Sequence, residues 1–176
     1  MRPALLLDVD GVLCPFGASK TPDGYSRYAI RENWAYLSPA NAHRLTRLRQ
    51  HFDLRWCTAW GDQANEHLLD FHNLQPLPLI RFEGRRHDPK APHWKMPWIK
   101  AWARQKPFAW IDDEINDEVV AWAEKRTADG HPTLALCIPY DEGLGDQHVT
   151  ALEEWARSLQ PENAAKSSKS EPALET

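Results

Sequence analysis

The stretch Leu5-Leu6-Leu7-Asp8-Val9-Asp10-Gly11-Val12-Leu13 decides the fold class of this chain. Its apolar beginning predicts a buried strand, and the two acids that follow are spaced i, i+2. Side chains two residues apart in a strand point to the same side, so both carboxylates face one point at the strand's carboxyl end. Gly11 then allows a sharp turn and lets backbone amides approach a ligand closely. Two neighbouring carboxylates repel each other unless a cation or a shared proton neutralises them, so the pattern indicates a metal site.

Two plainer interpretations of the same acids stay open at this point. One is a calcium-binding loop, but an EF-hand loop carries further oxygen ligands at alternate positions and a glutamate at the twelfth. Here Val12 and Leu13 follow instead. The other interpretation is a polar turn that binds nothing, and only the rest of the chain can decide against it.

Composition limits the class of protein. The 176 residues suit one domain with a normal core, and the net charge of −4 gives no overall basic footprint. This argues against a dedicated nucleic-acid binder but leaves local basic patches open. The cysteines Cys14, Cys57 and Cys137 lack metal-type spacing, so we expect a reduced, cytoplasmic protein. The chain enters its first strand without a signal-peptide pattern and has no stretch of membrane-spanning length, so no membrane partner is expected.

Apolar runs alternate with helical periodicity along the chain. The predicted strands are Ala4–Val9, Asp53–Thr58, Leu77–Phe82, Pro107–Ile111 and Thr133–Ile138. Helices are expected after the caps Ser38, Asp62 and Asp146, from Pro97, and over 115–126. This order predicts an α/β fold, a Rossmann-like parallel sheet with helices on both faces and ligands at the carboxyl ends of its strands. We expect residues 1–160 to form this domain, with an irregular loop or small hairpin within 15–37, and 161–176 to form a disordered tail.

Polar residues end three of the predicted strands. Asp8 and Asp10 end the first, Thr58 the second, and Asp112 and Asp113 follow the strand that starts at Pro107. Converging acids suit Mg²⁺, which prefers carboxylates, water and substrate phosphate. Alone, Asp112 and Asp113 could equally be acids that favour a helix N-terminus, and both interpretations can hold together.

Two further features complete this predicted pocket. Thr58 precedes a predicted helix, so its hydroxyl and the following amides, beginning with Ala59, could cradle a phosphate beside Gly11. Lys95 could bind a phosphate oxygen and a carboxylate at once. We prefer it to Lys90 and Lys100 because it stands directly before a helix.

The order of these motifs resembles that of the haloacid dehalogenase-like (HAD) superfamily. The motifs are Asp-Val-Asp-Gly-Val, then a Thr at a strand end, then a Lys, then Asp-Asp at a strand end. The segments LLLDVDGVLCP, RWCTAW, HWKMPWIKAW and FAWIDDE look like the HAD-type domain associated with bacterial RNA-repair proteins. The resemblance spans residues 4–159 and implies a HAD-like fold. It also implies an Mg²⁺-dependent phosphatase that acts through an aspartyl-phosphate.

The resemblance assigns roles to residues of this chain. Asp8 would be the nucleophile, and Asp10 the general acid and then the general base, with its backbone carbonyl on Mg²⁺. Thr58 and Lys95 would bind and stabilise the phosphoryl group. Asp8, Asp112 and Asp113 would complete the metal site. The second aspartate, Asp10, favours phosphate chemistry over dehalogenation, because attack on carbon needs no acid for an alcohol leaving group.

The spacing of these motifs leaves room only for a small flap after the first strand, so the enzyme is expected to be essentially capless. An open site admits a large substrate, such as a nucleic-acid end or a phosphoprotein. A local basic run could grip further phosphates or be a solvated loop, and His87 and His93 are expected at the surface. That run consists of Arg81, Arg85, Arg86, His87, Lys90 and His93.

The expected function is therefore a phosphatase that acts on a nucleotide or polynucleotide end. A non-catalytic phosphate-sensing or partner-binding module and a phosphotransferase are the alternatives. In the flap, Tyr25, Tyr28 and Trp34 are expected to close a small core of their own rather than stack on a base. No oligomeric state is indicated.

Overall fold

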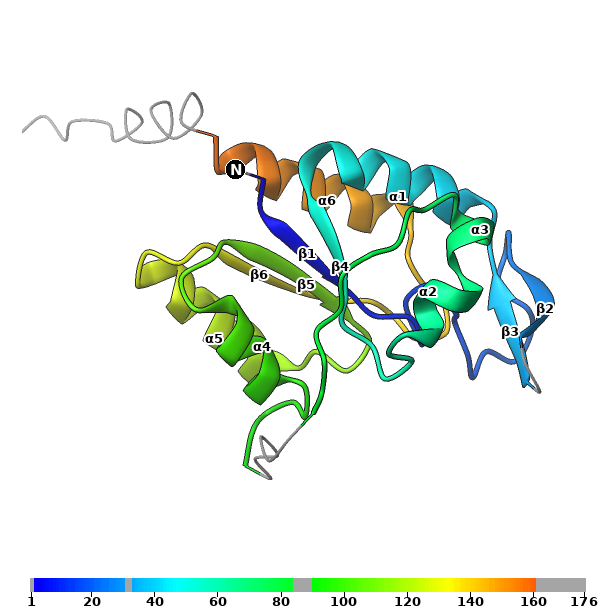
Figure 1. Cartoon of the computed structure of the whole chain (residues 1–176), viewed down its shortest axis with the longest axis horizontal. Coiled ribbons are helices and arrows are strands. Elements are labelled where there is room, and N and C mark those ends of the chain that lie inside the picture. The colour runs from blue at the N-terminus through cyan, green and yellow to red at the C-terminus, as the bar shows by residue number, and fades with distance from the viewer. Residues whose placement is uncertain (1, 31–32, 84–89, 161–176) are drawn as a thin grey trace, which may run out of the picture.

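A parallel sheet of four strands forms the centre of the molecule (Figure 1). The computed structural model describes residues 2–30, 33–83 and 90–160. The strand order is β4 (Asp53–Trp56), β1 (Ala4–Leu7), β5 (Phe108–Asp112) and β6 (Thr133–Cys137). Leu7 of β1 pairs in register with Trp56 on one side and Ile111 on the other, so β1 is central and its end lies between the ends of β4 and β5.

Helices cover both faces of the sheet, as expected for an α/β fold. Figure 1 shows α1 and α6 side by side on one face and α4 and α5 on the other. Successive residues of β1 serve the two layers: Leu5 and Leu7 pack with the α1–α6 layer, and Leu6 packs with the α4–α5 layer. The helices are α1 (Ala40–His51), α2 (Gln63–His67), α3 (Leu69–His72), α4 (Met96–Ala103), α5 (Asp117–Ala128) and α6 (Asp146–Ser158).

The expected strand over 77–82 is wrong. Only an isolated bridge joins Leu79 to Trp56, through bonds from the Trp56 N–H to the Pro78 carbonyl and from the Ile80 N–H to the Trp56 carbonyl. Proline has no N–H to donate, so Pro76 and Pro78 prevent a continuous ladder beside β4. The sheet therefore ends at β4 on this side within the described chain.

Several predicted helix starts also differ from the structure. Ser38 makes no capping bond to α1, whose N-cap is Pro39. The single helix expected after Asp62 is split into two short helices, α2 and α3, which meet at Leu68 (φ −110°, ψ −13°). Asp146 is the first residue of α6 rather than its cap.

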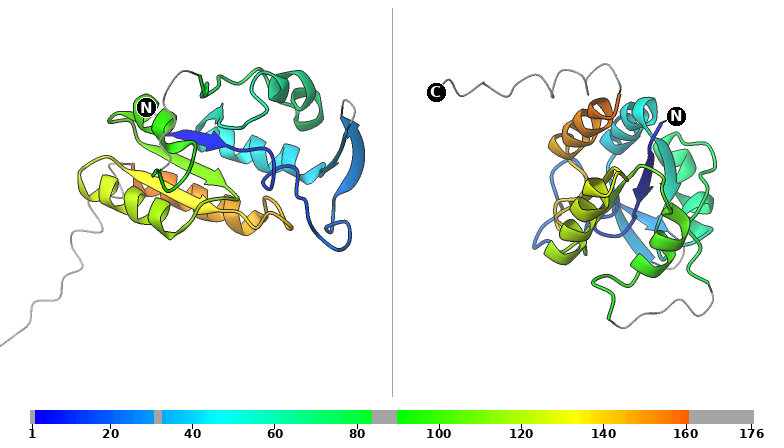
Figure 2. Two further views of the ribbon diagram at one scale, coloured as in Figure 1. Left: turned by 90° about the horizontal axis from the view of Figure 1, so that it is seen from below. Right: turned by 90° about the vertical axis from the view of Figure 1, so that its left-hand side faces the viewer.

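The flap after β1 contains a small antiparallel hairpin, one of the two forms expected for it. Its strands are β2 (Ser26–Ile30) and β3 (Asn33–Leu37). Figure 2 shows the hairpin standing off the end of the sheet, on the side where β1 terminates. It therefore stands beside the edge at which an α/β sheet binds ligands.

The predicted tail, residues 161–176, lies outside the described residues. No helix in the described ranges is both long and apolar enough to cross a lipid bilayer.

Candidate active site

Lys95 joins the ends of two neighbouring strands. Its Nζ lies 2.6 Å from Oδ2 of Asp8, which follows β1, and 2.7 Å from Oδ2 of Asp112, at the end of β5. All three residues are buried, with 5 % exposure or less. Charge-assisted hydrogen bonds of this length are strong, particularly where water is excluded. Three residues that sequence spacing placed at one edge of the sheet thus form one network.

The network gives its two carboxylates different proton affinities. Burial raises the pKa of Asp8 to about 7, although the charge of Lys95 opposes this. Burial also acts to raise the pKa of Asp112, but the hydrogen bond from His93 and the charge of Lys95 outweigh it and bring the pKa to about 2. Burial alone would lower the pKa of Lys95, yet the two carboxylates hold it above its usual value. The single ammonium of Lys95 compensates only part of the charge of two acids, so Asp112 stays ionised and Asp8 is the more basic of the two.

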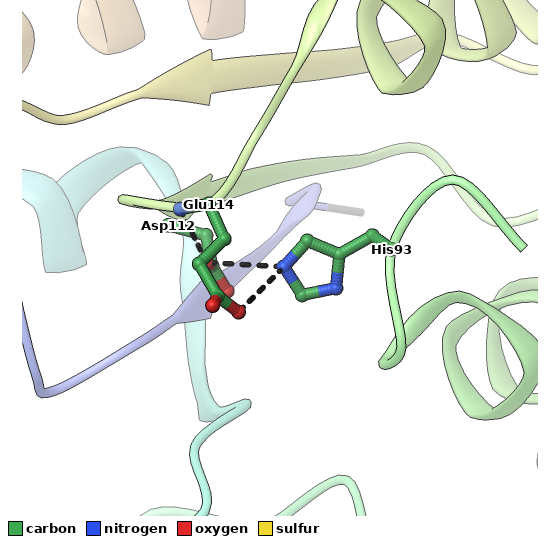
Figure 3. Close-up of side chains that lie close together, drawn as sticks. All are labelled: His93, Asp112 and Glu114. Atoms are coloured by element: carbon green, nitrogen blue, oxygen red, sulfur yellow. Dashed lines mark hydrogen bonds and ion pairs between the residues drawn. The ribbon is translucent and has the colours of Figure 1, made fainter.

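His93 belongs to this network, and its expected surface position is wrong. It is 4 % exposed, and its Nε2 lies 3.2 Å from Oδ1 of Asp112 (Figure 3). Its Nδ1 accepts a hydrogen bond from the backbone N–H of Lys95 at 3.0 Å. Since a backbone N–H can only donate, Nδ1 is the acceptor and Nε2 carries the hydrogen that points to Asp112. His93 therefore positions Asp112 from the loop that leads into α4.

Three of the acids bring potential magnesium ligands together. Asp8, Asp112 and Asp113 each offer a carboxylate oxygen, and the three oxygens lie within 4.8 Å of one another. Burial and the charge of Asp112 raise the pKa of Asp113, and the charge of Lys95 offsets only part of this rise. Carboxylates crowded in this way fit a hard divalent cation.

A second group, His93, Asp112 and Glu114, also brings its potential ligand atoms together (Figure 3). Its histidine offers a protonated nitrogen rather than a lone pair, so it suits a metal less well than the carboxylate group does.

Gly11 lies against the carboxylate group. Its φ is +71°, and a Cβ at this position would overlap the side chain of Asp113. The glycine therefore permits both the left-handed turn after β1 and the close approach of Asp113.

Trp60 connects the remaining predicted residues. Its indole Nε1 donates to Oδ2 of Asp10 at 2.9 Å, and its backbone N–H donates to the hydroxyl of Thr58 at 3.3 Å. Thr58 is buried at the end of β4, next to β1, while Ala59 and the carboxylate of Asp10 are exposed. Asp10 thus faces solvent beside the buried network, where it can reach a bound substrate.

The basic run predicted beside Lys95 does not form one patch in the described chain. Arg81 pairs with both carboxylate oxygens of Asp62 at 2.9 Å, and His93 is buried in the site. Lys90 is exposed, while Arg85, Arg86 and His87 lie outside the described residues.

The aromatic residues of the flap divide into two groups. Tyr25 is buried and its hydroxyl lies 3.5 Å from Nδ2 of Asn41 in α1, while Tyr28 packs edge-on against Phe71 of α3 with ring centroids 4.9 Å apart. The expected separate flap core is therefore wrong, because these two rings pack against the domain itself. Trp34 does not join them, because 61 % of its surface is exposed.

A parallel sheet whose strand ends carry this acid and lysine network defines a HAD-type domain. Residues 4–149 match the family described as the HAD domain in Swiss Army Knife RNA repair proteins, and the chain belongs to this family. HAD domains are in general phosphatase-type hydrolases. No curated protein and no solved structure matches the chain.

Proposed function

We propose that this protein is an Mg²⁺-dependent phosphomonoesterase that forms an aspartyl-phosphate on Asp8 and acts on a nucleotide or polynucleotide end. The observation that carries the proposal is the buried contact of Lys95 with both Asp8 and Asp112, with Asp113 and Asp10 beside it. The family's occurrence in RNA repair proteins supports the choice of a nucleic-acid substrate.

The first step is attack by the Asp8 carboxylate on phosphorus. The bond from phosphorus to the leaving oxygen breaks, and that oxygen takes a proton from Asp10. Lys95 and the Thr58 hydroxyl bind the phosphoryl oxygens and stabilise the charge that spreads over them. The products of this step are the free alcohol and phosphorylated Asp8.

The second step releases phosphate. Asp10, now ionised, accepts a proton from a water molecule whose oxygen attacks the phosphorus, and Asp8 leaves as a carboxylate. His93 holds Asp112, and Trp60 holds Asp10, through both steps. When bound by Asp8, Asp112 and Asp113, Mg²⁺ would neutralise charge on these carboxylates and on the phosphoryl group.

The mechanism is tested with a generic aryl phosphate and Mg²⁺. Asp8→Asn should abolish turnover, and the parent alone should show a phosphorylated Asp8 by mass spectrometry after rapid acid quench. Asp70→Asn is the matched control, because it makes the same change at an exposed carboxylate in α3 and should leave turnover unchanged. Equal activity of Asp8→Asn and the parent would refute the nucleophile assignment.

The role of Asp10 has its own test. A good leaving group such as nitrophenolate needs little protonation, whereas an alkoxide does. Asp10→Asn should therefore slow the hydrolysis of alkyl phosphates more than that of nitrophenyl phosphate, and an equal effect on both would contradict acid catalysis.

The alternative functions have their own outcomes. If a broad panel of phosphate esters showed no Mg²⁺-dependent turnover while the protein still bound phosphate, a non-catalytic module would be favoured. Phosphate transfer to an added alcohol would indicate a phosphotransferase.

A further inference from the structure

A pocket of about 640 Å³ opens beside Asp10. Four aromatic residues from separate parts of the chain line it: Phe16 after β1, Trp34 and Tyr36 on β3, and Trp60 before α2. The hairpin that supplies two of them stands at the carboxyl end of the sheet (Figure 2). The volume is typical of a small-molecule site, which spans roughly 300–1,000 Å³.

The aromatic lining is accessible rather than packed away. Trp34 is 61 % exposed and Phe16 is 47 % exposed. Phe16 is stacked on Tyr140 at 5.3 Å, and the guanidinium of Arg27 lies 4.2 Å from the centre of the Trp34 ring. Large exposed aromatic side chains gathered around a concavity are typical of a binding site for flat, apolar groups.

The pocket offers no cation for a phosphate among its described lining residues. Asp10 is the only one of them with an ionisable acid or base side chain apart from Cys14 and Tyr36. A phosphate is therefore better placed in the neighbouring network, where Lys95 supplies an ammonium. The pocket can accept an uncharged group that is attached to a phosphate bound at the neighbouring network of Lys95.

The proposed mechanism identifies that group. Asp10 gives its proton to the leaving oxygen, and Asp10 also lines the pocket, so whatever is attached to the leaving oxygen enters it. Trp60 strengthens this link, since the same indole lines the pocket and donates to the Asp10 carboxylate. The identity of this group rests on the proposed function.

We infer that the pocket binds the nucleoside that carries the scissile phosphate, with its base stacked against Trp34 and Phe16. Aromatic stacking suits every base and gives little sequence preference. Arg27, exposed beside Trp34, stands where it can contact the backbone phosphate of the next nucleotide in a longer strand. The site therefore recognises the terminal nucleoside of a polynucleotide without reading its sequence.

The test compares ligands that differ only in the base. Binding of adenosine 5′-monophosphate and ribose 5-phosphate to the Asp8→Asn protein is measured with Mg²⁺ by calorimetry, and kcat/KM for both is measured with the parent. The nucleotide should bind roughly 5- to 150-fold more tightly, the range expected from one base stack. Trp34→Ala should remove most of this ratio and Trp34→Phe should retain it. Trp122→Ala, on α5, is the control and should leave the ratio unchanged.

Equal affinity for the two ligands would overturn the inference, as would a ratio that Trp34→Ala does not alter. Preference for a phosphotyrosine peptide over the nucleotide would overturn it too, by assigning the pocket to a phenol ring. In each of these cases the turnover of a generic aryl phosphate would still support the phosphatase mechanism. Base-dependent binding without any turnover would instead uphold the base site and refute the proposed function.

Discussion

Lys95→Met tests the buried network directly. The change keeps an unbranched side chain out to the Cε position but removes an ammonium that lies 2.6 Å from Asp8 and 2.7 Å from Asp112. Removing one member of a buried ion pair costs about 3–5 kcal/mol, because the remaining charge stays buried without a partner. Asp112 would still accept bonds from His93 and the Trp110 indole, so we expect a loss near the lower end, about 3 kcal/mol. Against a total stability of about 5–15 kcal/mol, such a loss is easily measured.

The pH dependence of this loss has a definite sign. Burial already raises the pKa of Asp8 to about 7, and removing Lys95 raises it further. When the pKa of an acid is higher in the folded than in the unfolded protein, the folded state loses stability as the pH rises from the unfolded-state pKa to the folded-state pKa. The deficit of Lys95→Met should therefore grow as the pH rises through 7.

The assay is urea unfolding in EDTA, followed by circular dichroism. Lys100→Met is the matched control, since Lys100 is exposed on α4, the helix that begins directly after Lys95, and its loss should change stability by no more than about 0.5 kcal/mol. Adding Asp8→Asn to Lys95→Met should restore part of the stability lost above pH 7, because it removes an acid that ionises there without a compensating charge. A loss below about 1 kcal/mol, or a double variant no more stable than Lys95→Met, would refute the reasoning.

Three further changes have defined outcomes. Gly11→Ala should destabilise the protein more than Gly130→Ala, since both have positive φ but only the Gly11 Cβ overlaps Asp113; equal losses in urea unfolding would contradict this. Burial lowers the pKa of His72 to about 4 from 6.5, so its contribution to stability is complete above pH 6.5 and is lost as pH falls toward 4. His72→Leu should gain about 3 kcal/mol relative to the parent between pH 7 and pH 4, and parallel stability curves would disprove the shift. Mg²⁺ should raise the Tm of the parent more than that of Asp113→Asn; an identical rise would remove Asp113 from the ligand set.

The sequence located the buried network because its members occupy strand ends. Buried strands that alternate with helices make a parallel sheet, and the carboxyl ends of its central strands must meet. Asp8 and Asp112 could therefore be placed together from spacing alone, and Lys95 from its position before a helix. His93 could have been found by its place two residues before Lys95, but whether a loop histidine is buried depends on how that loop packs against β5.

Two errors had different causes, one local to the run and one a partner distant in sequence. The run 77–82 has the composition of a strand, yet its prolines cannot complete a ladder. Arg81 looked available for phosphate until the fold placed Asp62 against it.

Local properties of the chain, its backbone periodicity and strand spacing, therefore predicted the α/β class, the strand ends that carry acids and the position of the flap. Three features depended instead on the packing of distant segments: Lys95 lies between two carboxylates, Trp60 holds Asp10, and Trp34 stays exposed while Tyr28 is packed. Burial, hydrogen-bond partners and accessible surface arise when segments far apart in the chain come together, and no local pattern specifies them.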